Sequence, residues 1–146
     1  MNGDAPISTI MTPAPFEIDA GATLMHAEDR FRQHCVRHLV VTERGEAVGV
    51  LSERDVLFAR AVEGMDPSRV EVRAAMWPCE TYAPTAPIRE VVRAMADGRF
   101  GACIICVRGR ALGIVTTVDV CRAYADALDD AAVRHHPIRR VVATDG

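Results

Sequence analysis

The chain has 146 residues, 49% of them apolar and 25% charged, which predicts a globular protein large enough to bury a sizeable core. Its net charge of -3 argues against a nucleic-acid-binding surface or a surface for anionic membranes. All 17 basic residues are arginines, so mechanisms that need a lysine, such as a P-loop or a Schiff base, are excluded.

The first half of the chain predicts the order strand, helix, strand, strand, helix. Thr23 is a suitable N-cap for the first helix, and the loop around Gly45 is typical of a β-hairpin. The expected elements are a strand at 16–18, a helix from Thr23 to about Gln33, strands at 38–42 and 47–51, and a helix from Glu53. Gly64 followed by Pro67 then marks a boundary, because this combination ends helices.

The second half predicts the same order of elements. Its first helix carries apolar side chains at helical spacing. These apolar positions are Ile88, Val91, Val92 and Met95. Strands at 102–107 and 111–115 then lead into a helix from Thr117. The shared order indicates that the two halves are related.

The two halves are copies of each other. Residues 49–56 (GVLSERDV) return as residues 113–120 (GIVTTVDV), with glycine, two apolar residues, a hydroxyl, aspartate and valine in the same places. Either half alone would bury too little surface, so we expect an α+β fold whose repeats pack sheet to sheet with pseudo-twofold symmetry and enclose two equivalent clefts. The predicted units are a β-α-β-β-α repeat (1–66), a second such repeat (67–130) and a C-terminal tail (131–146). The tail is expected to be loosely ordered or to pack on a partner.

A hydroxyl and a carboxylate recur at each junction between a strand and a helix. Ser52 and Thr116 lie where the first N–H groups of a helix lack intrahelical partners and attract an anion such as phosphate. Asp55 and Asp119, three residues later, suit the two hydroxyls of a ribose. The spacing therefore predicts a phosphorylated ribose ligand. It also suits a capping box, which leaves open a structural or interaction module that binds no ligand.

Both copies carry motifs that resemble the tandem cystathionine-β-synthase (CBS) domain pair, also called a Bateman module. The matching segments are MTP at 11–13, VRHLVV at 36–41, Gly45 and GVLSERDV at 49–56, then Met76, Pro78, GACII at 101–105, Gly109 and GIVTTVDV at 113–120. This resemblance implies a regulatory protein that is not an enzyme and requires no cofactor. It implies that AMP, ADP, ATP or S-adenosylmethionine binds in the clefts, and that a homodimer signals to a partner protein of unknown identity.

The two copies differ in charge near the motif. Arg37, His38 and Arg54 accompany the first copy, and arginine is well suited to phosphate. Their uncharged counterparts are Gly101, Ala102 and Val118. We predict that phosphate binding depends mainly on the three basic residues, whether they converge on one cleft or divide between two. Trp77 stands where the first copy has the threonine of MTP; we expect it to pack in the core, with stacking on a base as the alternative.

Cysteine usage and hydropathy indicate a reducing compartment. The five cysteines show no disulfide-framework spacing, and no stretch is apolar enough for a leader or a membrane span, so we expect free thiols and a cytoplasmic location. Cys103 and Cys106 form a CxxC pattern, but residues three apart on a strand point to opposite faces. His34, Cys35 and His38 lie close in sequence and leave open a metal or redox sensor.

Overall fold

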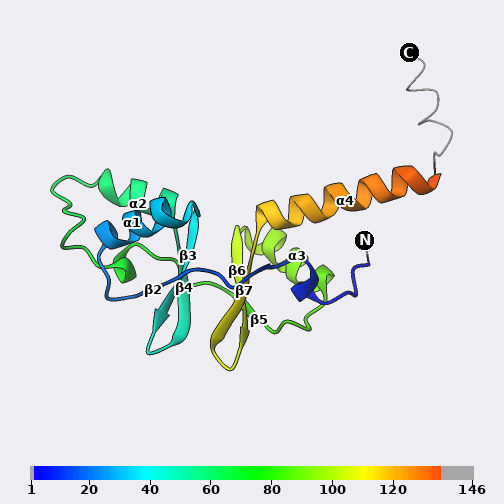
Figure 1. Cartoon of the computed structure of the whole chain (residues 1–146), viewed down its shortest axis with the longest axis horizontal. Helices are drawn as coiled ribbons and strands as arrows, with labels where there is room; N and C mark the ends of the chain where they lie inside the picture. The colour runs from blue at the N-terminus through cyan, green and yellow to red at the C-terminus, as the bar shows by residue number, and fades with distance from the viewer. Residues whose placement is uncertain (1, 136–146) are drawn as a thin grey trace, which may run out of the picture.

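The structure, a computed structural model, describes residues 2–135 and contains two small sheets and four helices (Figure 1). The helices are α1 (Leu24–His34), α2 (Glu53–Arg60), α3 (Ile88–Gly98) and α4 (Thr117–His135), with short 3-10 helices η1 (Ile7–Thr9) and η2 (Val72–Ala74). The strands are β1 (Thr12–Pro13), β2 (Glu17–Asp19), β3 (His38–Glu43), β4 (Glu46–Ser52), β5 (Thr81–Tyr82), β6 (Ala102–Val107) and β7 (Arg110–Thr116). The predicted order of strand, helix, strand, strand, helix is confirmed in both halves.

Three strands of each sheet share one topology, and β1 is added to the second sheet as a fourth strand. The strand orders of the two sheets are β2-β3-β4 and β1-β7-β6-β5. In each sheet a parallel strand, β2 or β5, lies beside an antiparallel hairpin, β3–β4 or β6–β7. The hairpins turn at Arg44 and Gly45 and at Arg108 and Gly109, where every residue has a positive φ, as type I′ turns require. The loop predicted around Gly45 is therefore a tight two-residue turn.

The sheets face each other through equivalent apolar side chains. Val40 and Val50 of the first half pack with Ile104 and Ile114 of the second, and all four are buried. These residues occupy the same two positions of the repeat, so the predicted sheet-to-sheet packing with pseudo-twofold symmetry is confirmed. In Figure 1 the helices of each half lie on the outer side of its sheet.

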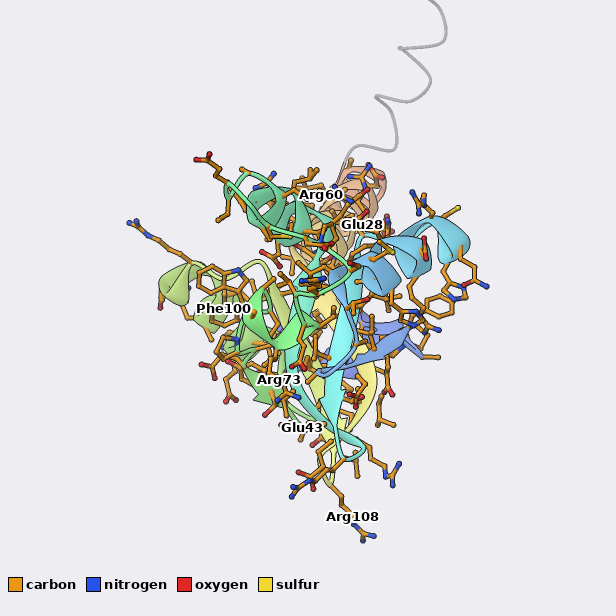
Figure 2. The ribbon with its side chains drawn as sticks, turned by 90° about the vertical axis from the view of Figure 1, so that its left-hand side faces the viewer. Glu28, Glu43, Arg60, Arg73, Phe100 and Arg108 are labelled. Carbon is orange, nitrogen blue, oxygen red and sulfur yellow. The ribbon has the colours of Figure 1, made fainter. Side chains whose placement is uncertain are left out.

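Each half also contains a segment from the other half. Ile7 of η1 is buried in the core of α3, β6 and β7, whereas Val72 of η2 is buried in the core of α1 and β3. β1 joins the sheet of the second half. Arg73, beside Val72, forms a 2.8 Å ion pair with Glu43 of β3 (Figure 2). The packed halves therefore interlock, and segments from both border the space between them.

Helix α4 is longer than expected. It continues past Asp130, after which the sequence predicts a tail, and reaches His135. In Figure 1 its C-terminal part projects away from the sheets. The remainder of the predicted tail, residues 136–146, lies outside the described residues. Within residues 2–135, none of the helices combines the length and the hydropathy needed to cross a membrane.

Candidate functional site

The first motif lies at the junction of β4 and α2. Ser52 ends β4 and is the N-cap of α2, whose first turn contains Asp55. The Asp55 N–H donates to Ser52 Oγ at 3.1 Å, and the Ser52 N–H donates to Asp55 Oδ2 at 2.7 Å. These reciprocal bonds form a capping box. The structural role that the spacing predicts is thus present, and it engages one carboxylate oxygen of Asp55.

Trp77 engages the other oxygen of Asp55. Its indole Nε1–H donates to Asp55 Oδ1 at 2.9 Å. Trp77 is 68% exposed, so the prediction that it packs in the core is wrong. The cause is the backbone, because the N–H and the carbonyl of Trp77 both pair with Val50 at the edge of β4. Gly49 permits this approach, since a Cβ there would lie 2.5 Å from the Trp77 carbonyl oxygen.

A cleft of about 400 Å³ opens beside this motif, and residues of both halves line it. We call it the first cleft. Its lining consists of Ser52 and Asp55 from the motif, His38 and Val50 from the neighbouring strands, and residues 77–79 and 99–102. The volume lies within the range of about 300–1,000 Å³ that is typical of small-molecule pockets. The first cleft therefore has the size and the mixed polar and apolar lining of a ligand site.

Arg99 and Phe100 line the first cleft although the sequence motifs did not single them out. Arg99 is the C-cap of α3 and has a φ of 54°, a left-handed conformation that is uncommon for residues other than glycine. Phe100 follows it and lies beside α3 (Figure 2). Sequence comparison pairs each motif with residues of its own half, whereas the cleft joins the first motif to the helix end of the second half. One sequence signal could have drawn attention to Arg99, namely that this charged residue occupies the position of the repeat that Cys35 occupies in the first half.

His38 lies half-buried at the side of the first cleft. It begins β3 and pairs with Ser52 across the hairpin. Burial lowers the pKa of its imidazole, Asp55 and Asp119 act to raise it, and Arg37 acts to lower it. Because the net pKa is below 6.5, the neutral imidazole is the favoured form near pH 7. His38 therefore contributes an uncharged hydrogen-bonding group to the cleft.

The two predicted arginines lie outside the first cleft. Arg54 is exposed on α2 and lines a second hollow of about 830 Å³ between α2 and residues 70–78, which we call the outer groove. Asp55 and Trp77 border both hollows. Arg37 is exposed and lines neither of them. Of the three basic residues predicted near the motif, only His38 joins Ser52 and Asp55 in the cleft.

The second motif is closed around its carboxylate. Asp119 is 7% exposed. Its Oδ1 accepts a hydrogen bond from Thr12 Oγ1 at 2.9 Å, and its Oδ2 accepts from the Thr116 N–H at 2.8 Å and the Thr116 hydroxyl at 3.1 Å. Thr12 occupies the same place in the repeat as Trp77. Thr116 and Asp119 are thus brought together as expected, but both oxygens of the buried carboxylate already accept hydrogen bonds.

The thiols near the sheets are held in their protonated form. Cys79 donates to a backbone carbonyl at 3.1 Å, and burial raises its pKa to about 12. Cys103 packs in the helix-side core whereas Cys106 packs in the inter-sheet core, which confirms that they lie on opposite faces. His34 stacks on Phe16 with ring centroids 3.9 Å apart. Among the described residues, no group of three or more His, Cys, Asp or Glu side chains is arranged to hold a metal ion.

Comparison with known proteins identifies the same two repeats. The family model described as CBS domain matches residues 7–62 and 72–126. An uncharacterized protein of Methanopyrus kandleri is 28% identical over 121 residues, which represent 81% of this chain and 59% of that protein. The chain therefore spans less than two thirds of the length of this curated relative.

Solved structures share the fold at low sequence identity. The CBS domain pair of protein MJ0100, in complex with 5′-methylthioadenosine and S-adenosyl-L-methionine, has a TM-score of 0.74 at 20% identity, and the match covers 84% of this chain and 98% of that one. The CBS domain of the bacterial CNNM/CorC family Mg²⁺ transporter, in complex with ATP, has a TM-score of 0.72 at 22% identity, with coverage of 82% and 86%. Two matched repeats and the shared fold show that the chain belongs to the CBS-domain family and carries two CBS domains in tandem.

Proposed function

We propose that this protein is a regulatory module that binds an adenosyl ligand in the first cleft. The observation that carries the proposal is that Ser52 and Asp55, at the start of α2, meet Arg99 of the other half in one cleft of about 400 Å³. Two proteins of the same fold hold such ligands, namely 5′-methylthioadenosine with S-adenosyl-L-methionine in one and ATP in the other. AMP, ADP, ATP and S-adenosylmethionine are therefore the candidate ligands.

Each side of the first cleft suits one part of such a ligand. Asp55 is assigned to the ribose, because an ionised carboxylate accepts hydrogen bonds from both hydroxyls. Ser52 and the N-terminus of α2 suit a phosphate, with Arg99 and His38 as further partners. The apolar part of the lining includes Val50, Pro78 and Phe100. Micromolar affinity requires about 8 kcal/mol, more than a charge at a helix end supplies, so contact between the base and this apolar lining must contribute much of it.

We propose one ligand site per chain. Both oxygens of Asp119 already accept hydrogen bonds from Thr12 and Thr116, and the side chain is only 7% exposed, so a ribose at Asp119 would have to displace donors from a buried carboxylate. Asp55 is less buried and borders the first cleft. We assign no ligand contact to Arg37 or Arg54, because neither lines the first cleft.

The arrangement of the cleft suggests how binding produces a signal. A ligand in the first cleft contacts both halves and therefore favours one relative orientation of the two sheets. The shift is limited to the difference in ligand affinity between the two orientations. We propose that a cytoplasmic homodimer passes this shift to a partner protein, with no catalysis and no required cofactor.

A substitution that fills the cleft tests this proposal. A Cβ at Gly101 meets no atom within 4 Å, so Gly101→Leu occupies the first cleft without displacing packed atoms. Calorimetric titration with AMP, ADP, ATP and S-adenosylmethionine should show one site per wild-type chain and roughly tenfold weaker binding to Gly101→Leu, at an unchanged melting temperature. Arg37→Leu, the equivalent change in the first half, should bind like the wild type. No binding of any of the four ligands to the wild type at millimolar concentration contradicts the proposal.

The capping box favours a second candidate, an interaction module that binds no ligand. Ser52 and Asp55 already satisfy each other's backbone N–H groups, which is a complete structural role. Under this alternative Asp55→Ala lowers the free energy of unfolding and Gly101→Leu changes nothing that is measured. The titration of wild type and Gly101→Leu therefore separates the two candidates.

A further inference from the structure

Trp77 lies between two hollows of the molecule. It borders the first cleft and also the outer groove of about 830 Å³. Its indole donates to Asp55, the carboxylate that the proposed function assigns to the ribose. Trp77 and a ribose in the first cleft would therefore donate to the same carboxylate.

We infer that Trp77 is a gate residue, which competes with the ligand for Asp55 and moves into the outer groove when the ligand binds. This inference rests on the proposed function and adds that the Trp77 indole limits the affinity of the site for its ligand. Asp55 Oδ2 is held by the Ser52 N–H, so Oδ1 is the oxygen that faces the competition, and Trp77 Nε1 lies 2.9 Å from it. A ribose hydroxyl that donates to Asp55 Oδ1 replaces the indole N–H of Trp77.

The indole is able to move while its backbone stays fixed. Two hydrogen bonds of 3.0 Å pair the Trp77 backbone with β4. The side chain is largely exposed, and its Nε1–H donates to Asp55 at the surface rather than inside the core. The outer groove offers the displaced ring an apolar surface, to which Phe58, Val62 and Met76 contribute. Movement therefore exchanges one hydrogen bond for apolar contact.

The second motif has no comparable gate. Thr12 donates to Asp119 from the place in the repeat that Trp77 occupies at Asp55. Asp119 also accepts two hydrogen bonds from Thr116 and is buried. Thr12 is exposed and Asp119 borders a hollow of about 470 Å³, but charged Arg122, Asp126 and Asp130 contribute to the lining of that hollow, and the short side chain of Thr12 has no ring to transfer into it. The gate is thus a property of the first motif.

A test without ligand uses the single tryptophan of the chain, whose indole N–H gives one cross-peak in a nitrogen-15 NMR spectrum. Asp55→Ala removes the acceptor and should move this peak to the position of a water-exposed indole. Ser52→Ala breaks the other half of the capping box but keeps the carboxylate, so the peak should stay in place. A peak that does not move in Asp55→Ala overturns the inference.

A test with ligand uses the tightest binder among AMP, ADP, ATP and S-adenosylmethionine. Saturation of the wild type should move the indole peak in the same direction as Asp55→Ala does. Trp77→Phe keeps an aromatic ring without the donor, and it should bind the ligand about fivefold more tightly, which corresponds to one net hydrogen bond of about 1 kcal/mol. Thr12→Val, the matched change at Asp119, should leave the affinity unchanged.

The outcomes distinguish the gate from the proposed function. Weaker binding to Trp77→Phe shows that the indole supports the ligand, and overturns the gate while the proposed function stands. An indole peak that keeps its position at saturation does the same. Absence of binding to both the wild type and Trp77→Phe overturns the proposed function and the gate together.

Discussion

Asp55 and Asp119 occupy the same position of the repeat but have different surroundings. Asp119 is buried and accepts hydrogen bonds from Thr12 and from two donors of Thr116. Asp55 is less buried, is shared between a capping box and the exposed indole of Trp77, and borders a cleft. In each copy one donor to the aspartate, the Thr12 hydroxyl or the Trp77 indole, comes from a segment outside the motif. The two copies therefore diverge through this donor, although the glycine, hydroxyl and aspartate of the motif are present in both.

The largest expected effect is the loss of stability when each carboxylate is removed. Asp119→Ala leaves the Thr116 N–H without its buried acceptor and should lower the free energy of unfolding by about 2–4 kcal/mol. Asp55→Ala removes one half of a partly exposed capping box and should lower it by about 1 kcal/mol. Urea denaturation of the two variants measures the difference. Equal losses would mean that the two carboxylates are equally structural.

The same two positions should rank in the opposite order for ligand binding. Asp55→Ala loses the group assigned to the ribose, and calorimetry should detect no binding of ATP at concentrations that saturate the wild type. Asp119→Asn keeps the shape of the side chain and one acceptor oxygen, and it should bind ATP like the wild type while it remains folded. Loss of binding in Asp119→Asn alone would assign the ligand to the second motif.

A smaller effect is expected at the helix ends, where Arg99 and Cys35 are equivalent C-caps with φ of 54° and 52°. Glycine adopts this conformation without a Cβ penalty, so Arg99→Gly and Cys35→Gly should each stabilise the fold by at most about 1 kcal/mol in thermal melts. Only Arg99→Gly should weaken ATP binding, by about tenfold, because Arg99 lines the first cleft and the phosphate contact proposed for it is a charge-assisted hydrogen bond. Equal weakening in Cys35→Gly would contradict the assignment of phosphate to this cleft.

The sequence predicted the fold well because the information is local and repeated. Val40 and Ile104 hold the same position in two apolar runs, and equivalent runs are expected to meet across a pseudo-twofold axis. The interlocking of the halves was not predicted. Ile7 and Val72 are equivalent apolar residues, and either arrangement buries both of them, so periodicity does not decide which core each one joins.

The sequence predicted only the part of the candidate site that local sequence describes. Ser52 and Asp55 belong to one local motif, and their junction of strand and helix follows from the apolar pattern. Arg99 reaches the first cleft only through the packing of one half on the other, which no local pattern describes. Trp77 is a large aromatic residue, for which burial is the ordinary expectation, but pairing at a sheet edge leaves its ring at the surface.

The smallest expected effect concerns His38, whose counterpart Ala102 does not titrate. Burial lowers the pKa of His38 in the folded protein below 6.5, so the unfolded chain takes up its proton first as the pH falls. The stability linked to the neutral imidazole is therefore fully present above pH 6.5 and declines as the pH falls toward the folded-state value. Urea denaturation across this range should show a flatter profile for His38→Asn. A profile for His38→Asn as steep as that of the wild type would contradict this prediction.

The affinity for a phosphorylated ligand should depend on pH in the opposite direction to the stability of the fold. Burial disfavours the imidazolium form of His38, whereas a phosphate beside it would favour that form. The affinity for ATP should then rise more steeply in the wild type than in His38→Asn as the pH falls from about 8 to about 6. Calorimetry in buffers of different ionisation enthalpy should show proton uptake in the wild type beyond that of the variant. Equal uptake in both proteins would remove His38 from the proposed phosphate contacts and leave Arg99 and the start of α2 as the proposed partners.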